Sequence, residues 1–278
     1  MKEKLTKECS MEFYGLLGEK LSHSLSPQIH KRIFDLIGIE GAYKLFPVPK
    51  DKVKKLGEGI KVFGIRGMNV TIPYKKEVMD QLDFISDEAR KIGAVNTISL
   101  ENGKLYGYNT DYYGFGCMLD INKIEVKDKR AVVLGTGGAA KAVVTYLQDK
   151  GVKELFVVSR NKVNNNWNGE VNLIDYSDLQ SLEGDLLINT TPVGMYPNVG
   201  KSPVGEEVIK RFEAIADLIY NPRETELLRL AKLNGKKNCD GLYMLVGQAV
   251  KAQEIWQDMN IDNKVTSIIY EELNGEFN

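Results

Sequence analysis

Residues 132–142 read VVLGTGGAAKA, a short apolar run followed by a glycine-rich turn and a helix-forming segment. The pattern G-x-G-x-x-A stands after a predicted strand and opens a predicted helix, which is the context of a dinucleotide fingerprint. Gly135 permits the tight turn, Gly137 lets a pyrophosphate approach the backbone, and Ala140 lets helix and strand pack closely. Free N–H groups at the start of the helix favour an anionic diphosphate. The stretch predicts a Rossmann-like nucleotide-binding domain, with a purely structural turn as the alternative.

The end of the next predicted strand indicates which nucleotide binds. An NAD site usually places Asp or Glu at this tip, where it accepts hydrogen bonds from the ribose 2′-OH. Here the strand ends in Ser159-Arg160 with Lys162 just beyond, and Glu154 stands at the wrong end. A guanidinium at the tip can pair with a 2′-phosphate and stack on adenine. These residues favour NADP, and a solvated arginine is the alternative.

Composition narrows the class of protein. The 278 residues suffice for one large or two medium domains, and 43% hydrophobic with 27% charged residues is typical of a globular protein. The net charge of −1 gives no support for nucleic-acid binding. No apolar run approaches the ~20 residues of a membrane span, and the first residues lack a signal peptide's apolar segment, so we expect a cytoplasmic protein. The three cysteines Cys9, Cys117 and Cys239 are far apart and histidines number two, which predicts neither a disulfide framework nor a metal site.

Strands and helices alternate in two blocks. Before about residue 110 we expect strands at 12–17, 43–48 and 67–72 with helices between them, a βαβαβ arrangement, and a further helix at 74–79. Asn102-Gly103 predicts a two-residue hairpin turn. From residue 130 the alternation resumes and predicts a doubly wound parallel sheet covered by helices. The fold class is therefore α/β, with two domains.

Two serines stand where the first strand gives way to a helix. Ser26 is a good N-cap with Pro27 at the first helical position, and Ser24 is left over. Two hydroxyls beside a helix N-terminus form a candidate carboxylate site. Simple capping is the alternative.

A second polar cluster follows the third predicted strand. Asn69 and Thr71 share one face of this strand by its period of two, and Lys75 follows its carboxyl end, where ligands usually bind in open α/β sheets. Asp111 closes the first block, as a helix cap or as a partner for Lys75. A lysine held by a carboxylate suits proton transfer at oxygen during alcohol oxidation or ketone reduction. An exposed lysine is the alternative.

These motifs together resemble the shikimate dehydrogenase family. The matching segments cover roughly residues 12–258 and occur in family order: GEKLSHSLSP at 18–27, GMNVTIPYK at 67–75, GAVNT at 93–97, GYNTD at 107–111, the glycine loop, NTTPVGM at 189–195 and GLYMLVGQ at 241–248. Each segment is weak evidence alone, and the set is specific.

The resemblance implies reversible NADP-linked reduction of 3-dehydroshikimate to shikimate, in the synthesis of chorismate and aromatic amino acids. It implies that Lys75 and Asp111 form the catalytic pair. It implies a substrate site of Ser24, Ser26, Thr71, Asn96, Tyr220 and Gln248. It implies a cofactor site of Gly135, Thr136, Gly137, Gly138, Ala139, Ala140, Ser159, Arg160, Lys162, Thr190, Met195, Gly241 and Met244.

The resemblance also implies a discontinuous substrate domain, residues 1–111 plus 243–278, around an NADP-binding domain at 112–242. Ser159 departs from the asparagine common in the family at this position. The alternatives are a quinate/shikimate dehydrogenase that prefers NAD, and a non-catalytic ligand-sensing module on the same fold. We expect a small-molecule substrate, no nucleic-acid, membrane or metal partner, and a monomer or homodimer.

Overall fold

The computed structural model describes residues 11–21, 24–160, 167 and 169–276. They form two compact units. The first contains the described residues up to Arg90, Ala94–Thr110 and Ala249–Glu271, and the second contains Lys91–Gly93, Asp111–Gln248 and the residues from Glu272 on. Gln248, expected in the substrate domain, therefore falls in the second unit. No turn marks this boundary in the sequence, because helix α9 (Leu242–Gln257) runs through it unbroken.

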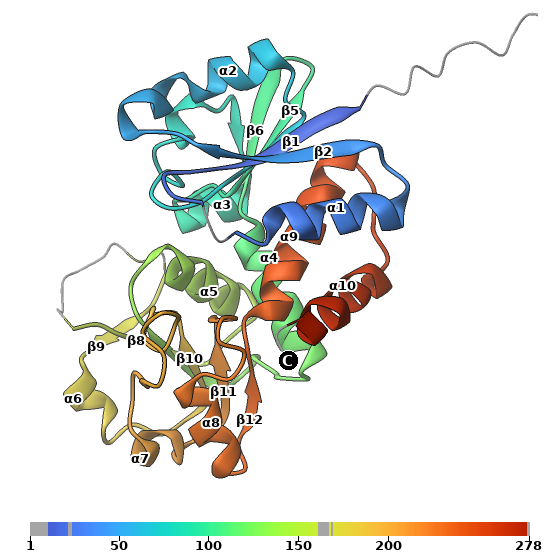
Figure 1. Ribbon diagram of the computed structural model, residues 1–278. Coiled ribbons are helices and arrows are strands. Elements are labelled where there is room, and N and C mark those ends of the chain that lie inside the picture. Colours follow the sequence, from blue (N-terminus) through green and yellow to red (C-terminus); the bar gives the residue numbers. More distant parts are fainter. Residues whose placement is uncertain (1–10, 22–23, 161–166, 168, 277–278) are drawn as a thin grey trace, which may run out of the picture. The chain divides into compact units, whose positions relative to one another are not determined.

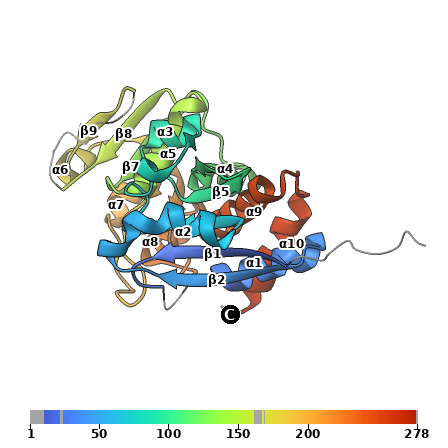
Figure 2. The same cartoon turned by 90° about the horizontal axis from the view of Figure 1, so that it is seen from above.

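The first unit is built on a mixed six-stranded sheet. Its strands are β1 (Glu12–Gly18), β2 (Gly41–Pro47), β3 (Gly67–Val70), β4 (Phe84–Ile85), β5 (Thr97–Glu101) and β6 (Lys104–Tyr108), in the order β2-β1-β3-β5-β6-β4. β1 pairs in parallel with β2 and β3, and β5 pairs antiparallel with β3 and β6. Figure 2 shows β1 and β2 running in the same direction. The expected βαβαβ arrangement of this unit is confirmed.

The hairpin between β5 and β6 turns where the sequence predicts it. Asn102 and Gly103 have φ values of 50° and 75°, as a type I′ turn requires at both central positions. Glu101 pairs with Lys104 on either side of the turn. The hairpin adds two strands to the sheet beside β3.

Helices cover the first sheet and enclose its core. They are α1 (Ser26–Ile37), the 3-10 helix η1 (Lys50–Lys55), α2 (Leu56–Phe63), the short 3-10 turn η2 (Met79–Gln81) and α3 (Asp87–Ile92), with part of α9 and of α10 (Asn263–Glu276). Trp256 of α9 is fully buried, and its indole Nε1 donates to the Ile98 carbonyl at 2.9 Å. This bond attaches α9 to strand β5.

Two local predictions in this unit were wrong. The predicted helix at 74–79 is a series of turns. The Lys75 carbonyl accepts the N–H of Val95 at 2.7 Å, and the Met79 N–H, its helical i→i+4 partner, donates to the Lys76 carbonyl instead at 3.1 Å. Ser26 is not the N-cap of α1 but its first residue, and Leu25 is the N-cap. The Ser24 hydroxyl accepts the Ser26 N–H at 3.2 Å instead, so the side chain that caps lies one position before the cap residue.

The second unit contains the predicted doubly wound sheet. Its six strands are all parallel, in the order β12-β11-β10-β7-β8-β9 (Figure 1): β7 (Arg130–Leu134), β8 (Glu154–Val158), β9 (Asn172–Ile174), β10 (Gly184–Asn189), β11 (Phe212–Asp217) and β12 (Lys237–Cys239). This is the strand order of a Rossmann fold, and β7 and β10 lie at its switch point. The predicted fold class is confirmed.

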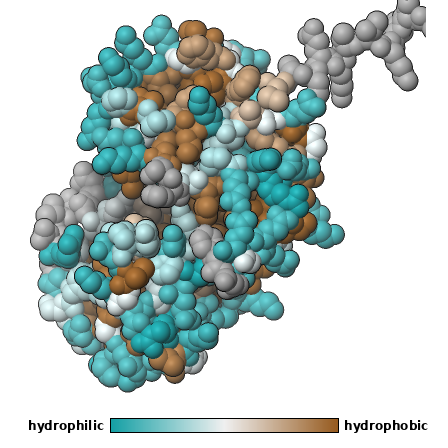
Figure 3. All heavy atoms as spheres, viewed as in Figure 1, coloured by the Kyte–Doolittle hydropathy of each residue, from teal (hydrophilic) through white to brown (hydrophobic). Residues whose placement is uncertain are grey.

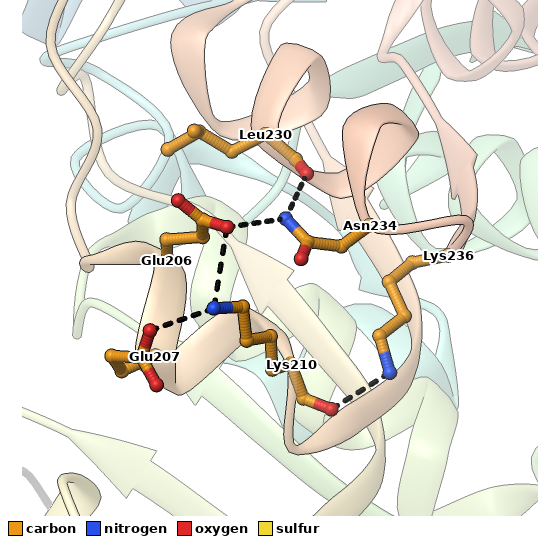
Figure 4. A network of polar contacts seen from close by, with 6 residues as sticks. All are labelled: Glu206, Glu207, Lys210, Leu230, Asn234 and Lys236. Atoms are coloured by element: carbon orange, nitrogen blue, oxygen red, sulfur yellow. Dashed lines mark hydrogen bonds and ion pairs between the residues drawn. The ribbon is translucent and has the colours of Figure 1, made fainter.

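The helices of the second unit are α4 (Thr110–Ile121), α5 (Gly138–Asp149), α6 (Tyr176–Leu179), α7 (Glu206–Ile209), α8 (Glu226–Leu233) and the first turns of α9. A polar network joins α7 to the end of α8 (Figure 4). Lys210 pairs with Glu206 and Glu207, and Asn234 donates to Glu206 at 3.2 Å. These groups are exposed or half-exposed, so each pair adds little to stability.

The outer surface is polar with scattered apolar groups. Figure 3 shows hydrophilic side chains over much of one face, and apolar side chains gathered on part of the first unit. Val62 and Phe63 at the end of α2 are exposed apolar side chains of that unit. Among the described residues, none of the helices combines the length and apolar character needed to cross a membrane.

Candidate functional site

A cavity of about 590 Å³ opens in the second unit at the carboxyl ends of β7, β8 and β10. Its volume is within the range of small-molecule sites, and its place at the switch point is where ligands bind in this fold. Its lining residues are Gly135, Thr136, Gly137, Val158, Ser159, Arg160, Tyr176, Thr190, Thr191, Pro192 and Val193. Six of them were predicted as cofactor residues.

The glycine-rich turn forms one wall of the cavity. Gly135 has φ +106°, which favours glycine, and a Cβ there would meet the Thr190 hydroxyl oxygen at 2.9 Å. Gly137 is different, because a Cβ on it would meet no protein atom within 4 Å. Packing within the protein therefore does not require glycine at Gly137. A ligand that approaches the backbone there would require it.

Helix α5 begins directly after this turn. Gly137 is its N-cap and offers no side-chain acceptor, and its first turn has no acidic residue. The orphan N–H groups and the positive end of the helix dipole thus favour an anion, such as a diphosphate. Ala140 is fully buried, as close packing of helix on strand requires.

The carboxyl end of β8 carries a basic side chain and no acidic one. Ser159 is buried, and its N–H donates to the Ile174 carbonyl of β9 at 3.0 Å. Arg160 is exposed and lines the cavity together with Tyr176. Burial raises the pKa of Tyr176 above its ordinary value, and the positive charge of Arg160 opposes this rise. The guanidinium and the phenol therefore lie close enough to interact electrostatically.

The opposite wall of the cavity is the loop after β10, which buried polar side chains hold in place by hydrogen bonds. The Asn189 side-chain oxygen accepts the N–H and hydroxyl of Thr191 at 3.0 and 2.7 Å. Asn189 in turn donates to Asp217 at 2.9 Å, and the Thr225 hydroxyl donates to the other oxygen of Asp217 at 2.7 Å. Burial raises the pKa of Asp217 to about 6, although these hydrogen bonds oppose the rise. The loop is thus fixed in place before any ligand binds.

Some predicted cofactor residues do not line this cavity, and some lining residues were not predicted. Lys162 lies outside the described residues. The cavity lining does not include Gly138, Ala139, Ala140, Met195, Gly241 or Met244. Sequence reasoning missed Val158, Tyr176, Thr191, Pro192 and Val193. The motif at 189–195 could have identified the last three, whereas Tyr176 follows a strand of three residues that carries no clear periodicity.

In the first unit, the two serines lie together at the start of α1. The Ser24 hydroxyl oxygen is 3.1 Å from that of Ser26, and both side chains are partly buried. Two adjacent hydroxyls at a helix N-terminus can donate to both oxygens of one carboxylate.

Thr71, Lys75 and Asn96 gather at the ends of neighbouring strands. The Val70 N–H donates to the Asn96 carbonyl at 2.8 Å, and the Val95 N–H donates to the Lys75 carbonyl at 2.7 Å. Thr71 follows β3 directly, and its N–H donates to the Leu17 carbonyl at 2.9 Å. The structure therefore brings the segment before β5 against the turn after β3. Thr71 and Lys75 are partly exposed and Asn96 is buried.

Asp111, Tyr220 and Gln248 belong to the second unit. Asp111 is a buried carboxyl in the first turn of α4, so it is not the cap of that helix. Burial raises the pKa of Tyr220. Helices α4 and α9 lie in backbone contact, since a Cβ on Gly114 would meet the Gln248 backbone nitrogen at 3.0 Å. Among the described residues, no group of three His, Cys, Asp or Glu side chains could hold a metal ion.

Comparison with known proteins identifies the family. The model of the shikimate dehydrogenase substrate binding domain matches residues 16–98. A shikimate dehydrogenase (NADP(+)) of Clostridium beijerinckii is 57% identical over 96% of this chain and 100% of its own length. The crystal structure of shikimate dehydrogenase 1 from Peptoclostridium difficile is 56% identical with a TM-score of 0.89, over 96% of this chain and 99% of that one. The Thermus thermophilus enzyme in complex with NADP(H) and shikimate is 32% identical with a TM-score of 0.83, over 94% and 99% of the two chains. The chain belongs to the shikimate dehydrogenase family.

Proposed function

We propose that this protein catalyses the reversible reduction of 3-dehydroshikimate to shikimate with NADPH. The observation that carries the proposal is the cavity of about 590 Å³ formed by the glycine turn, Arg160 at the end of β8 and the loop after β10. The relatives described above bear the name of this activity, and one of them is described with both NADP(H) and shikimate.

The residues of the cavity fit a phosphorylated dinucleotide. Gly137 leaves space for a diphosphate at the start of α5, and Arg160 supplies a cation where a 2′-phosphate would lie. The exposed side chain of Arg160 stays solvated until the phosphate binds, so its charge carries little desolvation penalty in the free protein. Bound NADPH supplies the hydride that reduces the C3 ketone.

The first unit supplies the groups that recognise the substrate. Ser24 and Ser26 donate hydrogen bonds to its carboxylate. Thr71, Asn96, Tyr220 and Gln248 are proposed contacts of the ring hydroxyls. Hydroxyl and amide groups suit a polyhydroxylated ring because each can donate or accept.

The proton is handled by Lys75 and Asp111. In the direction of reduction, Lys75 donates a proton to the oxygen at C3 as that oxygen gains negative charge, and in oxidation it accepts the proton back. Asp111 orients the ammonium group and accepts a hydrogen bond from the adjacent substrate hydroxyl. Such acid–base assistance typically contributes a factor of ~10²–10⁴ to the rate.

Initial rates with shikimate and quinate, each with NADP and NAD, test the proposal. The expected result is turnover of shikimate with NADP well above the other three combinations. Higher turnover of quinate with NAD would indicate the quinate/shikimate alternative, and saturable binding without turnover would indicate a sensing module. We also propose that the protein acts in the cytoplasm, in the synthesis of chorismate. Light scattering of the purified protein distinguishes a monomer from a homodimer.

A further inference from the structure

A row of hydrogen-bonded side chains lies behind the serine pair in the first unit. Tyr43 of β2 donates its phenolic hydroxyl to the Asn69 side-chain oxygen at 2.7 Å. Burial raises the pKa of Tyr43 well above its ordinary value, and a hydrogen bond from the side chain of Ser26 opposes this rise. Tyr43 therefore connects the serine pair to strand β3, and none of the roles described above involves it.

The direction of each hydrogen bond follows from the groups present. The Asn69 amide nitrogen donates to the Thr97 hydroxyl at 3.0 Å, which leaves the oxygen of that amide facing Tyr43. A carbonyl oxygen carries no proton, so the proton between them belongs to Tyr43. The Tyr43 oxygen must then accept the proton of Ser26. In the absence of a ligand, the Ser26 hydroxyl is thus directed at Tyr43.

The ring of Tyr43 is held as firmly as its hydroxyl. The His30 imidazole stacks on it with a centroid distance of 4.1 Å and an interplanar angle of 7°. His30 Nδ1 lies 2.9 Å from the Gln253 amide nitrogen, which can only donate, so Nδ1 accepts. Burial lowers the pKa of His30 to about 3, and the imidazole is therefore neutral at physiological pH. Helices α1 and α9 and strand β3 together fix Tyr43 in one position.

We infer that Tyr43 is a positioning residue for the substrate carboxylate, acting through Ser26. It holds the Ser26 oxygen beside that of Ser24, so that an arriving carboxylate finds both hydroxyls already spaced 3.1 Å apart. When the anion binds, the Ser24 proton turns from Ser26 and the Ser26 proton turns from Tyr43, both to the carboxylate, and Tyr43 keeps its bond to Asn69. The inference rests on the proposed function, because the carboxylate is that of shikimate.

Tyr43→Phe tests the inference by removing one oxygen atom and keeping the stacked ring. Ser26 then gains rotamer freedom that shikimate must restrict, so KM for shikimate is expected to rise about two- to tenfold. The kcat at saturating shikimate and the KM for NADP should not change. Tyr14→Phe is the matched control, because it removes a hydroxyl bonded to Glu12 and Gln257 in the same unit. This control should leave the KM for shikimate unchanged.

A double-mutant cycle shows whether Tyr43 acts through Ser26. In a Ser26→Ala background there is no hydroxyl to position, so adding Tyr43→Phe should raise the KM for shikimate no further. Additive effects would overturn the inference, because Tyr43 would then contribute independently of Ser26. An unchanged KM in the single Tyr43→Phe variant would overturn it as well.

Wild-type turnover separates failure of the inference from failure of the proposed function. If the wild-type protein does not oxidise shikimate with NADP, the proposed function fails and the inference fails with it. If the wild type is active and Tyr43→Phe matches it in every constant, only the inference fails. Thermal unfolding of each variant shows whether a changed KM comes from a fully folded protein.

Discussion

The side-chain oxygen of Asn96 accepts the backbone N–H of Thr110 at 2.7 Å and the Thr110 hydroxyl at 3.2 Å. Thr110 is the first residue of α4, and Asp111 follows it in the chain. Asn96, expected from the sequence to touch substrate, thus also attaches the start of α4 to the residue that precedes β5. Buried amides with fully used oxygens generally hold backbone in place.

Asn96→Ala should therefore lower both stability and kcat. It leaves the Thr110 N–H without its acceptor, which costs about 1–3 kcal/mol for a buried donor. The free energy of unfolding, measured with denaturant, and the steady-state constants check this expectation. Asn122→Ala is the control, because Asn122 donates to a carbonyl at the other end of α4. A rise in KM with unchanged stability and kcat would mean that Asn96 serves substrate alone.

Lys75→Ala should lower kcat by ~10²–10⁴-fold and raise the KM for shikimate far less, because a proton-transfer group acts mainly in the transition state. Asp111→Asn should lower kcat too, and the double variant should lose less than the product of the two, since they act as a unit. Steady-state rates with shikimate and NADP measure all three. The exposed neighbour Lys76, changed to Ala, controls for loss of charge in the same turn. Near-wild-type kcat for Lys75→Ala would refute the assignment.

Arg160→Ala should raise the KM for NADP tenfold or more, on the order of 1.5–3 kcal/mol for a lost charge-assisted contact. NAD has no 2′-phosphate, so its kinetics should change little. Added salt should weaken NADP binding more than NAD binding, because one more charge pair is screened. Arg211→Ala removes another exposed arginine of the same unit and serves as the control. Equal damage to both cofactors would assign Arg160 a stacking or structural role instead.

Ser24→Ala and Ser26→Ala should each weaken shikimate binding and leave NADP affinity of the free protein unchanged. The cost in stability, about 1 kcal/mol for a lost helix cap, belongs to Ser24, whose oxygen accepts the Ser26 N–H at 3.2 Å. Equilibrium binding and thermal unfolding measure the two effects separately. If Ser24→Ala binds shikimate like the wild type, the carboxylate is recognised elsewhere.

His30 should make the protein less stable as the pH falls below about 6.5. Burial lowers its pKa to about 3, so below the ordinary value of 6.5 the unfolded chain binds a proton that the folded chain does not. The free energy of unfolding therefore falls by about 1.4 kcal/mol per pH unit as the pH decreases from 6.5 towards the pKa of His30 in the folded protein. Between about pH 5 and 6.5 carboxyl groups with ordinary pKa values stay ionised, and Asp217, whose pKa is about 6, is present in both proteins, so His30→Gln should show a shallower slope than the wild type. Ile29→Val, a buried neighbour, should lower stability without changing the slope.

Local sequence patterns were sufficient to predict the structure wherever a short segment determines its own backbone conformation. The glycine turn at Gly135, the hairpin at Asn102-Gly103 and the alternation of strands and helices all depend on residues adjacent in the chain, and each formed where it was predicted. The doubly wound sheet follows from that alternation, because parallel strands need helical crossovers. The family followed from the order of the motifs.

Tertiary contacts decided the features that depend on distant partners. The turn after β3 is not a helix because Val95, 20 residues further on, takes the Lys75 carbonyl. Tyr176 enters the nucleotide cavity only because β9 adds to β8, and three residues are too few to show a strand's period. Tyr43 is placed by His30, Asn69 and Gln253, from three separate segments. The sequence by itself determined most of the elements and all of the chemical groups, whereas packing between segments decided the turn after β3 and which groups meet, because no local pattern encodes a partner that lies far along the chain.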